Sequence, residues 1–366
     1  MGNRTESSFF VLLSLALSLV VLYSPNAFLV AANSEQTCSS DYSSAPAEFN
    51  LTASQIEEYE RDGFIIVKGL IQGEDLTKAI QAVNKIQKRQ SIGQRIFYKL
   101  MPTYKNLSFQ TWRSHKALEH IAFDSAAPTI SAKLMGLDSS VDGETRSLRL
   151  LKDAVLGYTA GDKGCGWHVD DKMFWPCEDR KFGDRDAGIN VWITLSPISA
   201  KEGGGLAVAK GSHKVSFAEK AREVIAEKGG LTTCHLKSLD PQLNANMEEL
   251  KELHDLEAGD AIFHNRYLFH RVQSFFDEEN SRNKKTKQRI SLRYVSAGDT
   301  FYDDMGREGK AIEARGLKTG DVISKGEAWF PQTWPYRLTA EKNVRVKAEK
   351  NPFDLLKVLK LIKNFK

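Results

Sequence analysis

The sequence predicts a mostly β protein with flanking helices, in which the many short strands of the second half form a closed or sandwich-like core. From about residue 147, short runs rich in β-branched and aromatic residues alternate with Gly- and Asp-rich turns, as is typical of all-β cores. Before that point, apolar residues recur at helical spacing. Helical segments near 216–228 and 246–253 indicate an insertion between strands. The predicted strands cover residues 147–158, 166–175, 189–195, 205–209, 255–270 and 289–296.

The N-terminal elements follow from capping and periodicity. Thr52 and Gln55 have the spacing of a capping box, which predicts a short helix that ends at Gly63. The apolar run at residues 64–67 then predicts a strand. A second helix is expected at residues 74–88, because its apolar residues fall on one stripe. The domain is therefore expected to open with a helix–strand–helix unit.

The composition is that of an ordinary globular protein without a nucleic-acid partner. The chain has 366 residues, of which 41% are hydrophobic and 27% charged, enough to bury a sizeable core. Its 51 basic and 47 acidic residues leave a net charge of +4, too even a balance for a nucleic-acid-binding surface. Four cysteines without C-x-x-C spacing exclude a disulfide scaffold, and pairing of Cys165 with Cys177 is left open. We expect a monomer that acts on a small molecule.

Residues 1–32 have the three-part layout of a secretory signal peptide or a related targeting leader. An apolar run at residues 9–23 is followed by a Ser-Pro-Asn break and by small residues at 30–32. Ala27-Phe28 also resembles the signal/transit junction of plastid proteins in diatoms and related algae. We therefore expect entry into the secretory pathway, ending in the ER, the exterior or, in an alga, a complex plastid. No transmembrane segment is expected after leader removal, and an uncleaved signal anchor is the alternative.

Two further segments flank the predicted domain at residues 51–300. Residues 33–50 are rich in Ser and Ala and are expected to form a linker. The C-terminal extension, residues 301–366, ends in a basic amphipathic segment at residues 353–366. The apolar positions of this segment recur at helical spacing, which predicts a helix docked on the domain. A membrane-surface helix is the alternative.

The segment Trp167-His168-Val169-Asp170 carries the strongest chemical signal. In an extended strand, residues two apart point to the same face, so His168 and Asp170 converge. With one histidine from another strand they form the two-histidine, one-carboxylate set that holds non-haem Fe(II). Asp171 is the alternative carboxylate, but its spacing of three from His168 puts it on the opposite face. Trp167 and nearby aromatic residues are placed to shield the centre.

The third ligand has to come from a later strand, and several histidines qualify. A Gly-Asp turn at residues 259–260 precedes a predicted strand that contains His264 and His270. These two share strand parity, so parity does not separate them. His213 follows Gly-Ser in a turn and is expected to be structural. The downstream candidates are His213, His235, His254, His264 and His270.

Five blocks of the sequence resemble, in order, the phytanoyl-CoA dioxygenase family, also called the PhyH-like family. The resemblance spans residues 51–296 and implies a double-stranded β-helix core of the jelly-roll or cupin-like type. In that family the distal histidine lies a fixed step after the Gly-Asp turn, which implies His168, Asp170 and His270 as the metal ligands. The blocks are LTASQIEEYERDGFIIVKGL, WHVDDKMFW, VWITL, GGGLAVAKGSHK and GDAIFHNRYLFHRV.

The resemblance also implies Fe(II), 2-oxoglutarate and O2 as cofactors, with an arginine to hold the remote 2-oxoglutarate carboxylate. Arg289 and Ser291 point the same way on a late strand, similar to the Arg-x-Ser element of 2-oxoglutarate dioxygenases. Arginine suits a carboxylate because its fork binds both oxygens. Arg293 has the same parity and is the alternative. Trp192 is expected either to line the cosubstrate pocket or to pack in the core.

Two departures from the family pattern concern this element. The loop between His270 and Arg289 is longer than the family usually has. Val272 stands where the family has a serine that binds 2-oxoglutarate, so one expected hydrogen bond is absent.

The resemblance implies an oxygenase that oxidises an unactivated C–H bond of a small organic metabolite and releases succinate and CO2. Hydroxylation, desaturation or oxidative ring closure is expected, and Asp170 argues against halogenation because halogenases of this type lack the carboxylate ligand. The alternatives are a cupin-type metal protein without 2-oxoglutarate chemistry and a non-catalytic member of the fold. Two or more cations lining the pocket would favour an acidic substrate. The candidate substrate-binding residues are Arg149, Arg266 and Trp167.

Overall fold

The structure, a computed structural model, describes most of the predicted domain. The described residues are 49–89, 106–138, 146–162, 164–170, 174–214, 219–220, 223, 236–277, 286–302, 312 and 316–335. The expected leader, residues 33–48 of the expected linker, nearly all of the helix expected at 216–228 and the amphipathic tail lie outside them, as do Asp171 and His235. No helix within these ranges is long and apolar enough to cross a membrane.

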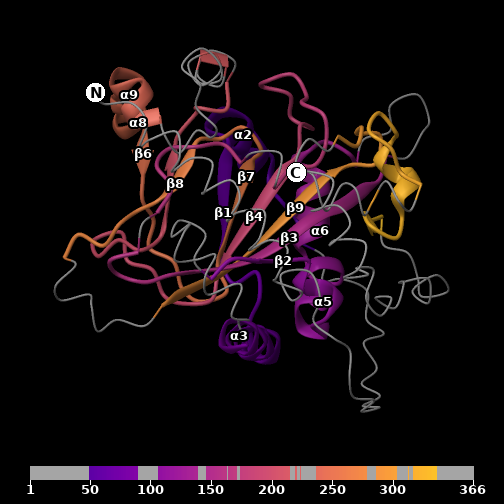
Figure 1. The fold of residues 1–366 in the computed structure, drawn as a ribbon, viewed down its shortest axis with the longest axis horizontal. Coiled ribbons are helices and arrows are strands. Elements are labelled where there is room, and N and C mark those ends of the chain that lie inside the picture. The colour runs from indigo at the N-terminus through magenta and orange to yellow at the C-terminus, as the bar shows by residue number, and fades with distance from the viewer. Residues whose placement is uncertain are drawn as a thin grey trace, which may run out of the picture.

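Seven strands form one antiparallel sheet at the centre of the molecule (Figure 1). They are β1 (Phe64–Val67), β2 (Ser108–Phe109), β3 (Leu148–Tyr158), β4 (Ile189–Thr194), β7 (Ala261–Asn265), β9 (Lys287–Ser296) and β10 (Gln332–Trp334). Their order across the sheet is β1-β7-β4-β9-β3-β10, and β2 also pairs with β3. Since β4 lies between β7 and β9, three strands distant in sequence present their side chains together.

A second, three-stranded antiparallel sheet packs against the first. Its strands, in the order β6-β5-β8, are β6 (Lys251–Glu252), β5 (Leu206–Ala209) and β8 (His270–Val272). Trp192 and Ile262 of the seven-stranded sheet share one buried cluster with Leu206 and Val208 of the smaller sheet. Two packed antiparallel sheets of this kind make the double-stranded β-helix, so the predicted fold class is confirmed.

Helices cover the other face of the seven-stranded sheet. They are α2 (Ala53–Asp62), α3 (Gly73–Lys88), α5 (Lys116–Phe123) and α6 (Ala127–Leu134). Strand alternation puts Ile189, Val191 and Ile193 of β4 into the core that these helices share. The alternate residues Asn190 and Trp192 therefore point between the two sheets, where polar side chains are available for a site.

The remaining elements are short. The insertion between β5 and β6 contains α8 (Leu236–Leu239) and α9 (Pro241–Glu249), which lie beside β6 and β8 in Figure 1. Two 3-10 turns, η2 (Thr111–Arg113) and η4 (Ile323–Gly326), complete the described elements. Because β10 pairs with β3, the packed domain continues past the boundary expected at residue 300.

The capping-box prediction is confirmed, whereas two strand predictions are wrong. The Thr52 side chain accepts the Gln55 amide at 3.2 Å and the Gln55 side chain accepts the Thr52 amide at 2.9 Å. Within the described residues of the strand expected at 166–175, the pairing is one bridge between His168 and His270. The strand expected at 255–270 is interrupted because the Asn265 side chain accepts the Tyr267 amide at 2.9 Å and forms a turn.

The disulfide left open between Cys165 and Cys177 is not formed. Cys177 is buried with a reduced thiol. The Cys165 sulfur is in a disulfide whose partner lies outside the described residues.

Candidate metal centre

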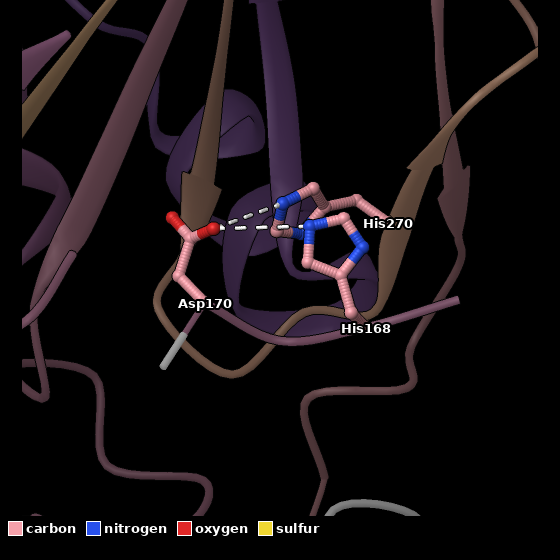
Figure 2. A group of neighbouring side chains, drawn as sticks. All are labelled: His168, Asp170 and His270. Carbon is pink, nitrogen blue, oxygen red and sulfur yellow. Dashed lines mark ion pairs between the residues drawn. The ribbon is translucent and has the colours of Figure 1, made fainter. Parts of the chain in front are cut away.

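The fold brings together the three residues expected to bind a metal. One nitrogen each of His168 and His270 and one oxygen of Asp170 lie within 4.8 Å of one another. Asp170 Oδ1 lies 3.8 Å from His168 Nε2 and 3.7 Å from His270 Nε2, and Figure 2 shows it pointing at both rings. The His168 side chain is 19% exposed, against 8% for His270 and 5% for Asp170, so the cluster is approached from the His168 side.

The main chain sets the spacing of the two imidazoles. His168 N–H donates to His270 O at 3.1 Å, and His270 N–H donates to His168 O at 3.0 Å. Each ring also donates its Nδ1 proton to a backbone carbonyl, Gly166 O at 2.8 Å and Leu268 O at 2.9 Å. Since a carbonyl only accepts, both Nε2 atoms carry a free lone pair, as metal ligation requires.

The electrostatics give these ligands the protonation states that a divalent metal needs. Burial, with the neighbouring His270, lowers the pKa of His168 to about 4. Burial alone would raise the pKa of Asp170, but Arg293 and the two imidazoles outweigh it and hold that pKa well below its ordinary value. At neutral pH the cluster is therefore a neutral imidazole beside an ionised carboxylate, ready to bind a cation.

The second oxygen of Asp170 is held by the seven-stranded sheet. Arg293 on β9 donates to Oδ2 from Nε at 3.0 Å and from Nη2 at 2.8 Å, and Asn190 on β4 donates from Nδ2 at 3.1 Å. The Ser291 hydroxyl donates to Asn190 Oδ1 at 2.7 Å. Ser291 and, as the alternative to Arg289, Arg293 were expected near the cosubstrate, and the structure places both on this network. Asn190 was missed, although its place between buried apolar residues of a strand was a usable signal.

Arg289 lies on the same face of β9 as Ser291 and Arg293, nearer the N-terminal end of the strand. Its side chain is buried, and burial lowers its pKa to about 10. Its Nη1 atom has no hydrogen-bond partner within the described part of the chain. A buried guanidinium N–H without an acceptor fits an incoming carboxylate, because buried donors are otherwise almost always paired. These residues therefore fit a metal ion together with a carboxylate-bearing cosubstrate.

Comparison with known proteins agrees with this geometry. The phytanoyl-CoA dioxygenase (PhyH) family matches residues 59–274. The chain belongs to that family. No curated protein matches it.

Solved structures of low sequence identity share the fold of this phytanoyl-CoA dioxygenase family member. The non-heme α-ketoglutarate dependent carbocyclase SnoK from nogalamycin biosynthesis has a TM-score of 0.54 at 16% identity, covering 78% of this chain and 97% of that one. EctD from S. alaskensis with bound Fe has a TM-score of 0.49 at 14% identity, covering 72% and 82%. The likeness to SnoK supports the double-stranded β-helix.

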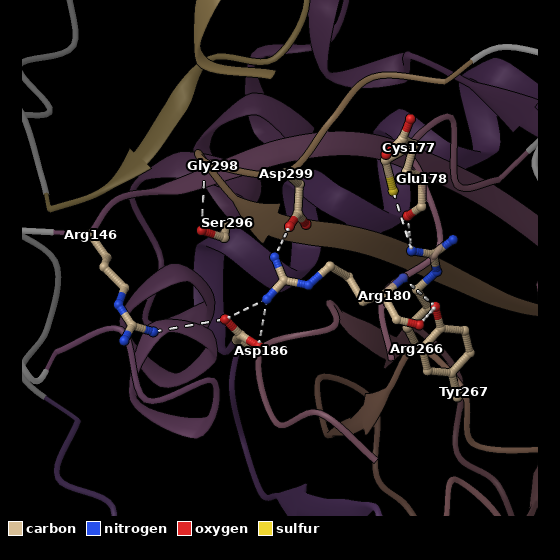
Figure 3. Close-up of polar contacts among 10 residues, drawn as sticks. All are labelled: Arg146, Cys177, Glu178, Arg180, Asp186, Arg266, Tyr267, Ser296, Gly298 and Asp299. Atoms are coloured by element: carbon tan, nitrogen blue, oxygen red, sulfur yellow. Dashed lines mark hydrogen bonds and ion pairs between the residues drawn. The ribbon is translucent and has the colours of Figure 1, made fainter. Parts of the chain in front are cut away.

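In this family member, the three candidate substrate-binding side chains form contacts with other protein side chains. Arg149 of β3 pairs with Glu327, which precedes β10. Figure 3 shows Arg266 pointing at Cys177 and Glu178, with Nη1 lying 3.4 Å from the Cys177 sulfur. Each of these two cations already has partners that the sequence pattern did not reveal, so neither adds support for an acidic substrate.

Trp167, the third candidate, is part of a clamp behind the two imidazoles. Its Nε1–H donates to Glu248 of α9 at 2.9 Å. Arg271 donates to the same carboxylate from Nε at 3.1 Å and from Nη2 at 3.0 Å, and its guanidinium lies 4.9 Å from the Trp167 ring. Trp167 precedes His168 and Arg271 follows His270, so one glutamate of the insertion ties both ligand-bearing segments together.

The segment after Asp170 is held by a second polar network (Figure 3). Arg180 donates to Asp299 at 2.9 Å and to Asp186 at 3.1 and 3.0 Å. The Tyr267 hydroxyl donates to Arg180 O and accepts Arg180 N–H, both at 2.9 Å. Burial raises the pKa of Asp299 to about 6 despite Arg180. This network joins the segment to the turn between β7 and β8.

Two other histidines are accounted for. His213 lies 3.2 Å from Glu60 O through Nε2, consistent with its expected structural role. The His264 ring packs 4.8 Å from that of His270, and Nδ1 bonds Asn265 O at 3.0 Å. His264 is thus a buried neighbour of the cluster, while His270 supplies the third atom.

Trp192 packs between the sheets with Ile262 and Leu206. Core packing was one of its two expected roles.

Proposed function

We propose that this chain is an Fe(II)- and 2-oxoglutarate-dependent oxygenase that oxidises an unactivated C–H bond of a small organic metabolite. The observation that carries the proposal is the convergence of two imidazoles and one carboxylate, on the same inter-sheet face as a buried arginine with an unused donor. Family membership supports the reaction class. SnoK, which shares this fold, is a non-heme α-ketoglutarate dependent enzyme.

Each residue of the site has a defined task in this proposal. His168, Asp170 and His270 would hold the iron through Nε2, Oδ1 and Nε2. Arg289 binds the remote carboxylate of 2-oxoglutarate. With O2 as the oxidant, the bound iron and cosubstrate would supply oxidative decarboxylation of 2-oxoglutarate to succinate and CO2, coupled to oxidation of the substrate C–H bond. Because Asp170 keeps its coordination position, hydroxylation, desaturation or ring closure is proposed rather than halogenation.

An anaerobic titration tests this proposal. Purified protein with Fe(II) and 2-oxoglutarate is expected to show a weak visible charge-transfer band, absent in His168→Ala. The matched control is His254→Ala, since the His254 ring packs 5.4 Å from the Phe64 ring and lies outside the cluster. Succinate release, screened against candidate metabolites, then identifies the substrate. A folded, iron-loaded wild type without the band would overturn the proposal.

Two alternatives give different results in the titration and in the succinate screen. A cupin-type metal protein without 2-oxoglutarate chemistry would bind iron but show no band with 2-oxoglutarate. A non-catalytic member of the fold would release no succinate with any metabolite. The buried Arg289 donor favours the oxygenase over both, because neither alternative supplies an acceptor for it.

We also propose that the leader at residues 1–32 directs this oxygenase into the secretory pathway and that the mature chain is a monomer. The disulfide at Cys165 supports an oxidising compartment. N-terminal sequencing of the mature protein from its source tests the cleavage, and light scattering tests the monomer. A mature chain that still begins at Met1 would argue for an uncleaved anchor.

A further inference from the structure

The two oxygens of Asp170 face different surroundings, and this difference points beyond the ligand set itself. Oδ1 faces the imidazoles of His168 and His270. Oδ2 is turned toward β4 and β9, where it accepts three N–H bonds at 2.8 to 3.1 Å from Arg293 and Asn190. An oxygen that accepts three donors has no lone pair left for a metal, so the carboxylate is set for one-oxygen ligation.

The donors themselves are fixed. The Arg293 side chain is 3% exposed and its guanidinium lies 4.5 Å from the Phe174 ring, which limits its rotation. Asn190 is buried, and the Ser291 hydroxyl donates to its Oδ1, which keeps the amide N–H₂ toward Asp170. In the strand register, Asn190 is opposite Arg293 and Trp192 is opposite Ser291, so the sheet holds the whole set in place.

We propose that Arg293, Asn190 and Ser291 are positioning residues that hold Asp170 to one-oxygen metal ligation and so keep coordination positions open for the cosubstrate. The inference rests on the proposed metal site. It gives Ser291 and Arg293 a task distinct from cosubstrate binding. It predicts that their loss changes the affinity and coordination of the metal rather than 2-oxoglutarate recognition. Arg293 also adds a positive charge behind the carboxylate, which favours Fe(II) over Fe(III).

Metal affinity of the apoprotein, measured with Co(II) alone, tests the inference without turnover. Outer partners of metal ligands change affinity by about 10- to 100-fold, so Arg293→Gln is expected to weaken Co(II) binding by that factor. Ser291→Ala acts through Asn190 and should weaken it by less, about threefold to tenfold. Arg293→Lys should recover part of the loss, since an ammonium restores the charge but not the fork.

The Co(II) absorption spectrum separates positioning from a general loss of packing. A carboxylate released by Arg293→Gln can add its second oxygen, which raises the coordination number and weakens the d–d absorption. The matched control is Arg149→Gln, a buried arginine of the same sheet that pairs with Glu327. It is expected to lower stability while leaving Co(II) affinity and spectrum as in the wild type.

The outcomes are distinguishable from those of the proposed function. If the wild type fails to bind Co(II), the metal site and the proposed function both fail. If the wild type binds Co(II) and Arg293→Gln and Ser291→Ala both match it in affinity and spectrum, the positioning inference alone is overturned. If Arg293→Gln does not fold, Ser291→Ala decides, because it removes only a hydroxyl.

Discussion

Replacing Arg289 by glutamine should produce opposite effects on stability and on cosubstrate affinity. The side chain is 8% exposed and its Nη1 lacks an acceptor in the described part of the chain. In the protein without cosubstrate, the guanidinium is therefore a desolvated charge with incomplete partners. With 2-oxoglutarate bound, it becomes one half of a buried ion pair. Glutamine keeps a polar side chain, although a shorter one, and removes the charge.

The size of both effects follows from burial. Burial lowers the pKa of Arg289 from its ordinary value to about 10, which corresponds to about 3 kcal/mol against the charged form. Arg289→Gln should recover part of this and raise the unfolding free energy of the cosubstrate-free protein by about 1–3 kcal/mol. Removing one partner of a buried, hydrogen-bonded charge pair costs about 2–5 kcal/mol, so 2-oxoglutarate affinity should fall by about 30- to 4000-fold.

Two measurements check this prediction. Urea unfolding of the cosubstrate-free variant reports the gain in stability, and anaerobic titration of the charge-transfer band reports the loss of 2-oxoglutarate affinity. Arg149→Gln serves as the control, because its arginine is paired with Glu327 and should lose stability without losing cosubstrate affinity. Wild-type affinity for 2-oxoglutarate in folded Arg289→Gln would refute the assignment of this residue.

Three further predictions concern metal, packing and pH. A divalent metal at about 100 times its Kd should raise the unfolding free energy by about 2.7 kcal/mol, a rise in Tm of about 5–10 °C by calorimetry, and a chelator or His168→Ala should abolish it. Glu248→Gln should lower the unfolding free energy, measured by urea unfolding, by about 1–2 kcal/mol after discounting for the partial exposure of Glu248. The reason is that it weakens the charge-assisted hydrogen bonds to Trp167 and Arg271. The control Glu249→Gln should be neutral, and an equal loss in both variants would contradict the clamp. The pKa of Asp299 is raised to about 6, so the folded state binds more protons than the unfolded state between about pH 4 and 6. Stability therefore falls as pH rises through this window, and the unfolding free energy of wild type minus that of Asp299→Asn should drop by up to about 3 kcal/mol from pH 4 to 7; a flat difference would contradict it.

The fold was predictable because it follows from local pattern. Alternation along residues 189–194 separates the helix-covered face from the inter-sheet face, and this two-residue period is visible in the sequence itself. The interruption of the strand expected at 255–270 was not predictable from the pattern. It depends on the Asn265 side chain forming a turn in place of continued pairing, and asparagine is tolerated in either setting.

The clustering of His168, Asp170 and His270 was predictable, and the residues that surround them were not. The His-x-Asp spacing indicates two ligands by geometry, while the choice of His270 over His264 came from the family resemblance. The hydrogen bonds from Arg293 to Asp170 depend on the register of β9 against β4, which cannot be predicted from residue spacing along the chain. The same holds for Arg149, whose partner Glu327 is distant in sequence.

The two reciprocal backbone hydrogen bonds between His168 and His270 have a consequence for how the protein acquires its metal. The distance between the two rings is a property of the backbone, so it exists before any ion arrives. Loading should then be a single encounter whose rate is proportional to metal concentration, without the slow ordering phase of proteins that fold around their metal. Hydrogen exchange at these two amides should likewise be slow in the metal-free protein, and it would report how often the His168 segment separates from β8 at the site.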